Sequence, residues 1–349
     1  MLGHRTPSWS FMLLDHEDRP LRLLDGVTGG SGEIVAQARL GGSASLTIDE
    51  SGQGIDWMRH RVQVIYNPGI AGVDAWATGT YLFSSPTERH TDFGVTYDVD
   101  LHTKMVVPDE DTVGQRYSLA AALPIIPAVV ALIQSSGESR IAVTPSEKTL
   151  TSGLTWDAGT SKLTIINDLL AAAGYWSLWC DGAGQYRIEP YLAPEARPVA
   201  HTFAYGQDSL YLPDWDREQD HSAVPNRFVA VGQGDADTDA LVAVATNENS
   251  ASPYSYQARG RWITRTEDGV EAADLTVLEQ HAERRLRDAM SPVARLTVGH
   301  AMLPLDPNDL IEFIPEDGRR RLATIQRMRF DYDDFTDIDA EWREVIPLG

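Results

Sequence analysis

The feature that most constrains the fold is a succession of short strand-like segments in the first hundred residues, each followed by turn residues. Val62, Val64 and Tyr66 recur at every second position, and this alternation predicts a half-buried β-strand. The expected strands are Met12–Leu14, Leu21–Leu24, Glu33–Leu40, Ala44–Ile48, Arg61–Tyr66, Thr78–Ser84 and Val95–Leu101. Turn signals every ~8–12 residues favour a β-sandwich or β-barrel over βαβ units.

The pattern changes after residue 106, and the sequence predicts a mainly β chain with a small α+β module. Leu163, Ile166 and Leu170 share a helical face, and Gly174 supplies a stop, so a helix is expected there. The expected domains are a β domain at 1–106; an α+β module at 107–195 with helices at about 127–136 and 161–173 and a hairpin at 175–191; and a second β domain at 196–349 with an inserted helix at about 272–290.

The charge balance excludes some functions. With 29 basic and 51 acidic residues, the formal net charge is −22. Proteins that grip nucleic acid neutralise phosphates with basic patches, so sequence-specific nucleic-acid binding is not expected. Binding to anionic membranes is disfavoured for the same reason. An acidic surface can still serve DNA by repelling it.

Cysteine usage and the hydrophobic runs indicate synthesis in a reducing cytoplasm. Cys180 is the only cysteine, so no intrachain disulfide forms. Its aromatic and aliphatic neighbours favour a core position over a nucleophile. The residues 1–14 lack the features of a signal peptide, and the apolar part of Tyr117–Ser136 is too short for a membrane span of ~20 residues.

Catalytic and metal-binding motifs are missing from the sequence. It contains no Gly-x-Ser-x-Gly, His-Glu-x-x-His, P-loop or Cys-x-x-Cys pattern. The segment His16–Asp18 is better explained as a polar turn than as a set of metal ligands. The aspartates between Asp331 and Asp339 lack the glycine and distal glutamate of an EF-hand, which favours a solvated hairpin tip over a calcium site. We therefore expect no catalytic residue, cofactor or metal.

Tryptophans are the remaining candidates for ligand binding. Trp156, Trp176, Trp179 and Trp215 are able, as residue types, to form a platform for sugars. The first three lie beside a predicted helix and hairpin, which favours a role in the core. Paired carboxylates for glycoside hydrolysis carry no weight among 51 acidic residues.

The order of several segments along nearly the whole chain is more informative than any single motif. These segments are Gly32–Leu40, Gly42–Ser51, Ile55–Val64, Gly79–Pro86, Leu163–Tyr191, Pro225–Gly232, Ala251–Ser255, Gly260–Arg261, Ala282–Leu286 and Pro307–Phe313. Their succession resembles that of phage minor tail proteins, the baseplate-hub or tail-tip hub family.

The resemblance implies a homotrimer whose subunits each carry two related β-barrels of the tail-tube type, here 1–106 and 196–349. The six barrels would form a pseudo-sixfold ring in the virion tail. Such a ring joins the tail tube or distal tail protein to a tip, spike or fibre protein, with the tape measure protein as a further candidate partner. The family supplies no catalytic residue to carry over.

Charge and resemblance together suggest an acidic channel. A ring that lets double-stranded DNA pass should present carboxylates inward, since a basic lumen would hold the duplex. The candidate lumen residues are Asp109, Glu110, Asp111, Asp235, Asp237, Asp239, Asp331, Asp333, Asp334 and Asp337. Two alternatives stay open: a hydrolase of peptidoglycan or glycan at the tail tip, and a carbohydrate-binding adhesion module that uses the tryptophans.

Overall fold

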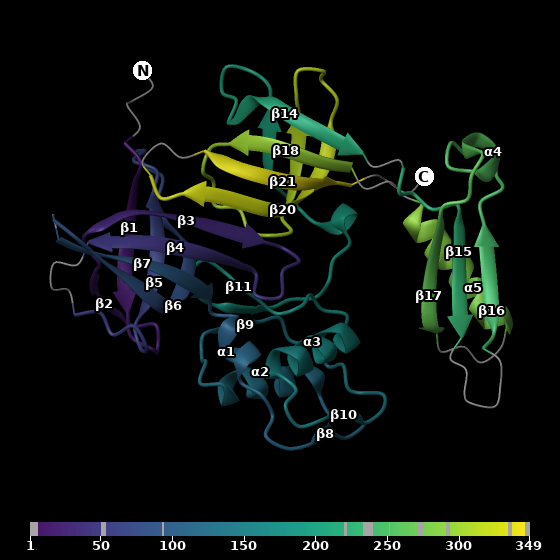
Figure 1. The fold of residues 1–349 in the computed structure, drawn as a ribbon, viewed down its shortest axis with the longest axis horizontal. Helices are drawn as coiled ribbons and strands as arrows, with labels where there is room; N and C mark the ends of the chain where they lie inside the picture. Colours follow the sequence, from purple (N-terminus) through teal and green to yellow (C-terminus); the bar gives the residue numbers. More distant parts are fainter. Residues whose placement is uncertain are drawn as a thin grey trace. The chain divides into compact units, whose positions relative to one another are not determined.

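The chain forms two compact units in the computed structural model (Figure 1), which describes residues 6–49, 54–92, 94–219, 222–232, 240–250, 252–270, 275–290, 294–333 and 337–345. Unit 1 comprises Met1–Trp215 and Thr297–Trp342, and unit 2 comprises Asp216–Leu296 and Arg343–Gly349. None of the helices in these ranges has the length and apolar character of a membrane span.

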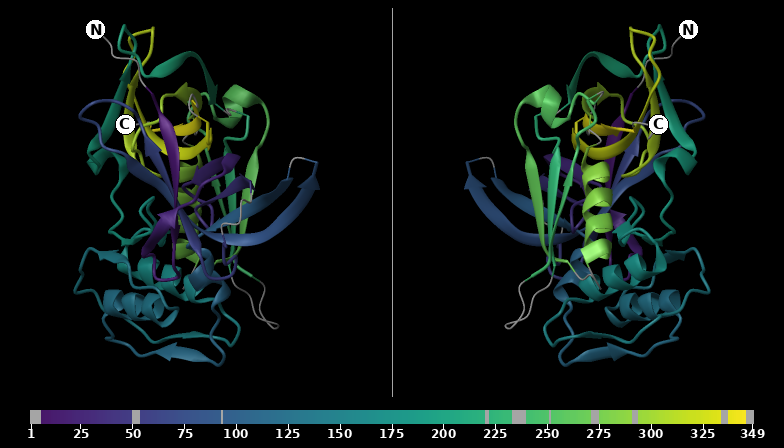
Figure 2. Two further views of the ribbon diagram at one scale, coloured as in Figure 1. Left: turned by 90° about the vertical axis from the view of Figure 1, so that its left-hand side faces the viewer. Right: turned by 90° about the vertical axis from the view of Figure 1, so that its right-hand side faces the viewer.

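The N-terminal part of unit 1 is an antiparallel β region. Its strands are β1 (Ser8–Leu14), β2 (Pro20–Leu23), β3 (Val27–Val35), β4 (Gly42–Asp49), β5 (Arg61–Asn67), β6 (Trp76–Thr91) and β7 (Gly94–Thr103), paired in the order β3-β4-β7-β6-β5-β1-β2. In β5 the alternating Val62, Val64 and Tyr66 are buried, as the sequence predicts. The long β6 and β7 form an extended hairpin (Figure 2).

An α+β module follows in the chain. Its elements are α1 (Val106–Glu110), β8 (Tyr117–Leu119), α2 (Ile125–Ser135), β9 (Ile141–Val143), β10 (Leu154–Trp156), α3 (Lys162–Ala173), β11 (Trp179–Cys180), β12 (Tyr186–Ile188) and the 3-10 turn Pro194–Ala196. Helix α3 is capped by Ser161, whose Oγ accepts from the Thr164 N–H at 3.2 Å, and it ends at Gly174 with φ 70°. Buried faces of α2 and α3 share one core with Tyr186 and Ile188 of β12.

The C-terminal strands that lie wholly or mostly in unit 1 continue the same sheet. They are β13 (Val199–Ala204), β14 (Tyr211–Gln219), β18 (Ala294–His300), β19 (Leu310–Ile314), β20 (Arg321–Asp331) and β21 (Ile338–Glu344). Strand β20 pairs with β3, with Met328 opposite Ile34 and Phe330 opposite Gly32. The path β14-β18-β21-β20 therefore runs on into β3, while β19 and β13 branch from β20.

The mainly β prediction is confirmed, but the two separate barrels are not seen as closed structures. A barrel closes when its first and last strands pair. Among the described strands, β20 instead joins β3 and makes one branched sheet of 13 strands, whose path ends at β2 and β14 and whose branch ends at β13. The pairing of β3 with β20 joins the segments 1–106 and 196–349, which are expected from the sequence to form separate β domains.

Unit 2 is a small two-layer structure. Its elements are β15 (Arg227–Gly232), β16 (Val242–Thr246), α4 (Tyr256–Arg259), β17 (Thr264–Val270) and α5 (Leu275–Ala289). The sheet has the order β16-β15-β17, and α5 lies along one of its faces (Figure 2). The core between sheet and helix consists of Phe228, Ala230, Ala243, Ala245, Val270, Leu278, Ala282 and Leu286.

A buried histidine lies in the aromatic core of unit 1. His300 is 1% exposed, and its ring lies 5.0 Å from that of Phe203 and 5.6 Å from that of Trp342. Its Nδ1–H donates to the Ala301 carbonyl at 2.8 Å. Burial lowers the pKa of His300 to about 4, and repulsion from His201 adds to this. The ring is therefore neutral at pH 7.

His300 should make the stability of unit 1 depend on pH. Its folded-state pKa lies below that of the unfolded chain, so unfolding takes up a proton between pH ~6.5 and ~4, and stability falls as pH drops through this window. The loss is about 3 kcal/mol at the acid end. Denaturant unfolding gives the free energy of unfolding at pH 7 and at pH 4. Its decrease between these two pH values should be about 3 kcal/mol smaller in His300→Phe than in the unsubstituted chain. Equal pH dependence in both proteins would contradict the assignment.

Candidate functional site

Four charged side chains from separate segments meet in the interior of unit 1. They are Asp18 in the β1–β2 turn, Arg61 in β5, Lys104 after β7 and Glu138 after α2, and none of the side chains is more than 9% exposed. Arg61 bonds Asp18 at 2.8 Å and Glu138 at 2.7 Å, while Lys104 Nζ lies 2.5 Å from Asp18 and 2.8 Å from Glu138. We call this set the buried charge cluster.

The buried charge cluster ties the β region to the α+β module. Lys104 also donates to the Gly184 carbonyl at 2.8 Å, and the Tyr186 hydroxyl donates to the Lys104 carbonyl at 2.7 Å. Burial by itself lowers the pKa of Arg61, but bonding to Glu138 and Asp18 raises it above the usual value. With two cations and two carboxylates mutually neutralised, the cluster is a structural joint and not an acid–base site.

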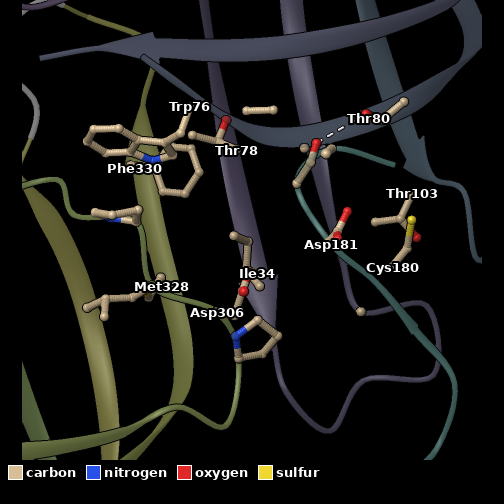
Figure 3. A pocket seen from close by; sticks show the side chains of 18 of the residues that line it. Ile34, Trp76, Thr78, Thr80, Thr103, Cys180, Asp181, Asp306, Met328 and Phe330 are labelled. Carbon is tan, nitrogen blue, oxygen red and sulfur yellow. Dashed lines mark hydrogen bonds between the residues drawn. The ribbon is translucent and has the colours of Figure 1, made fainter. Parts of the chain in front are cut away.

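A cavity of about 300 Å³ lies beside this joint, between β6, the β11–β12 turn and the segment Met302–Pro307 (Figure 3). Trp76, Met328 and Phe330 give it apolar walls, and Thr80 lies at its edge. Thr80 Oγ1 donates to the Gly182 carbonyl at 3.1 Å. A Cβ on Gly182 would lie 2.2 Å from the Ala77 carbonyl oxygen, so the turn approaches β6 this closely only with glycine there.

A larger groove of about 990 Å³ runs along the β3–β4 turn and the β11–β12 hairpin. Trp176 and Trp179 line it, and both are half-buried. The guanidinium of Arg197 lies 4.7 Å from the centre of the Trp176 ring, and that of Arg187 lies 5.8 Å from the Trp179 ring. Each tryptophan thus has an arginine over one ring face, and this face is not open to a stacked sugar.

Nucleophilic and metal-binding side chains have individual structural surroundings in the described part of the chain. Burial raises the pKa of the Cys180 thiol to about 12, so this thiol is protonated at neutral pH. Asp18 of the predicted polar turn His16–Asp18 belongs to the buried charge cluster. In the described ranges, no three His, Cys, Asp or Glu side chains are grouped as a metal ion would require.

The candidate lumen residues lie in separate parts of the chain. Asp109 bonds Arg39 of the β3–β4 turn at 2.7 Å, and Asp111 lies 2.5 Å from Lys162. Glu110 is exposed at the end of α1. Strand β20 ends at Asp331, and Asp331, Asp333 and Asp337 are exposed. Asp235, Asp237, Asp239 and Asp334 lie outside the described residues.

Comparison with known proteins yields structural relatives alone. No family model matches the chain, and no curated protein is significantly similar in sequence. Among solved structures, a tail protein of Neisseria meningitidis shares the fold with a TM-score of 0.65, 13% identity and coverage of 97% of both chains. The 43 kDa tail protein of prophage MuSo2 from Shewanella oneidensis gives a TM-score of 0.64 and 13% identity, covering 97% of this chain and 98% of that one.

A third structure comes from a secretion apparatus. The E. coli c3393 protein, a type VI secretion component described as structurally similar to the T4 tail proteins gp27 and gp5, gives a TM-score of 0.53 and 10% identity. The match covers 92% of this chain and 74% of that protein. The chain therefore has the fold of phage tail proteins, and the relationship that the order of its segments indicates is confirmed at the level of the fold.

Removing one member of the buried charge cluster should weaken the joint severely. Lys104→Met leaves two buried carboxylates against one guanidinium, and we expect a loss of about 3–5 kcal/mol in the free energy of unfolding, measured with urea. Lys104→Met combined with Glu138→Gln restores charge balance and should recover part of that loss. A single variant that loses less than about 1 kcal/mol would contradict this account of the joint.

Proposed function

We propose that this chain, which has the fold of phage tail proteins, is a structural hub of a phage or phage-derived tail tip or baseplate. The observation that carries the proposal is the match of almost its entire length to two tail proteins. The role is mechanical and requires no catalytic residue. A hub of this kind works in the virion tail and acts through shape, subunit contacts and electrostatics.

The hub assembles as a homotrimeric ring between the tail tube or distal tail protein and a tip, spike or fibre protein. Open strand edges support this assembly. The sheet of unit 1 ends at β2 and β14, and beyond Leu82 the edge of β6 that faces away from β7 has no partner among the described strands (Figure 2). Unpaired edges are templates for strands of a neighbouring chain, and a closed ring satisfies them without open-ended aggregation.

Acidic residues line the passage for DNA in this proposal. The net charge of −22 supports a wall that does not hold phosphates. The charges of Asp109 and Asp111 are partly neutralised by Arg39 and Lys162. These two aspartates therefore contribute less negative electrostatic potential to a channel than their formal charges would give. Asp331, Asp333 and Asp337 are three exposed candidate positions at which to test the lumen.

The oligomeric state tests the ring directly. Light scattering behind size exclusion should give 115.2 kDa, three times the 38.4 kDa of one chain, or twice that value for two stacked rings. The measurement should span a wide range of concentration, because assembly follows mass action. A mass of 38.4 kDa at every concentration would count against a ring that forms from this chain alone.

Charge reversal tests the lumen. Replacing Asp331, Asp333 and Asp337 by Lys should make the assembled ring retain duplex DNA at low salt, with retention that falls steeply as salt rises. The same change at the exposed Glu88, Glu147 and Asp157 alters the net charge equally and should cause no retention. Equal DNA retention by the two triple variants, measured by fluorescence anisotropy, would remove these aspartates from the channel.

A further inference from the structure

Strand β16 of unit 2 carries its larger aliphatic side chains on the face that points away from α5. In β16, Ala243 and Ala245 point toward α5 and are 2% and 6% exposed. Val242 and Val244 point away from α5 and are 52% and 55% exposed. A sheet with one face in water normally places its apolar residues inward and polar residues outward. Here the small residues are inside and the valines outside.

The neighbouring strand continues the same arrangement. The antiparallel register places Val229 opposite Val244 and Val231 opposite Val242, while Phe228 and Ala230 of β15 lie in the core against α5. Residues directly opposite one another share a face of the sheet. Val229, Val231, Val242 and Val244 therefore form one apolar patch, which we call the valine face.

One end of the valine face carries an arginine and two aromatic rings. Arg227 donates to Thr264 Oγ1 at 2.8 Å and lies 5.1 Å from the centre of the Trp262 ring. Trp262 stacks on Tyr256 with 4.4 Å between ring centres, and these two side chains are 37% and 39% exposed. Tryptophan, tyrosine and arginine dominate binding energy in protein interfaces.

The face also differs in charge from the chain as a whole. The register assigns eight outward positions to it: Arg227, Val229, Val231, Val242, Val244, Thr246, Thr264 and Thr266. These positions carry one guanidinium and no carboxylate, while the exposed Asp268 follows them by alternation on β17 and Glu248 accepts from Thr246 Oγ1 at 3.4 Å. The face therefore carries little net charge, on a chain of net charge −22. Two copies of so acidic a chain repel each other over most of their surface. An acidic second copy therefore meets less repulsion at the valine face than over an average part of the surface, together with the exposed apolar area of Val242 and Val244.

We propose that the valine face is a contact surface for a second copy of this chain. The inference rests on the proposed ring, since a threefold ring is built from heterologous contacts in which one patch of each subunit packs on a different patch of the next. The valine face supplies the apolar centre of that contact. Arg227 and the Trp262–Tyr256 stack supply its rim, where the guanidinium meets the acidic surface of the neighbour.

A single charge on the valine face tests this contact. Val244→Glu places a carboxylate where two copies meet, and it should raise the concentration needed for assembly by at least about tenfold. Val73→Glu is the matched control, because Val73 lies in unit 1, is 47% exposed and receives the same charge. By light scattering, the control should keep the mass of the unsubstituted chain. Val244→Glu should shift to single chains with an unchanged circular dichroism spectrum.

The outcomes separate this inference from the proposed ring. A trimeric parent chain whose mass survives Val244→Glu overturns the valine face as the contact and leaves the ring standing. A variant that loses thermal stability without any change of mass shows that another part of the same chain covers the face, and this also overturns the inference. A dimeric parent that Val244→Glu turns into single chains supports the contact while contradicting the threefold ring.

Cross-linking covers the case in which the parent chain is a single chain in solution. In a Cys180→Ser background, Val244→Cys labelled with a benzophenone maleimide should cross-link to a second chain on irradiation at high concentration, because the photoprobe reacts with whichever patch of the neighbour it faces. Val73→Cys with the same label should cross-link far less. Equal yields from the two variants overturn the contact, whatever the mass of the parent chain.

Discussion

The buried charge cluster is the constraint on which the rest of unit 1 depends. Lys104 leaves the β region at the end of β7, and its ammonium group reaches Asp18, Glu138 and the Gly184 carbonyl. This places the β11–β12 turn against β6, where Gly182 permits backbone contact. Arg39 adds a second tie, donating to Asp109 and to Ser161 and Thr164 at the start of α3. The α+β module is thus held to the sheet by backbone contacts and by ion pairs whose opposite charges largely cancel.

The second constraint is the pairing of β20 with β3. Four hydrogen-bonded neighbours, β21, β20, β3 and β4, join the first and last thirds of the chain into one sheet. The pairing of β20 with β3 resists bending between the N-terminal and C-terminal strands of the sheet, because all the hydrogen bonds between the two strands would have to shift together. For a tail hub, such rigidity suits a part that transmits load between a tube and a tip. The open edges at β2 and β14 then remain as places for neighbouring chains.

Local patterns in the sequence predict local structure well here and distant contacts poorly. Alternation predicts β5, whose Val62, Val64 and Tyr66 are buried. Asp109 and Asp111, two of the candidate lumen residues, lie at α1 and pair with cations from the β3–β4 turn and α3, which local patterns do not reveal. The β3–β20 pairing and the buried charge cluster join residues that are far apart in the sequence. The spacing of apolar residues along the sequence does not predict such contacts. The outward valines of β16 are visible in the sequence only once α5 is known to cover the alanines.

The central claim is that this chain closes into a ring around a passage. Cryo-electron microscopy of the purified chain tests it most directly, since class averages show subunit number and the central opening together. The account predicts a closed ring of three copies with an open centre, flanked by two β regions from each subunit. Single copies, open filaments or a ring with no passage large enough for duplex DNA would contradict it.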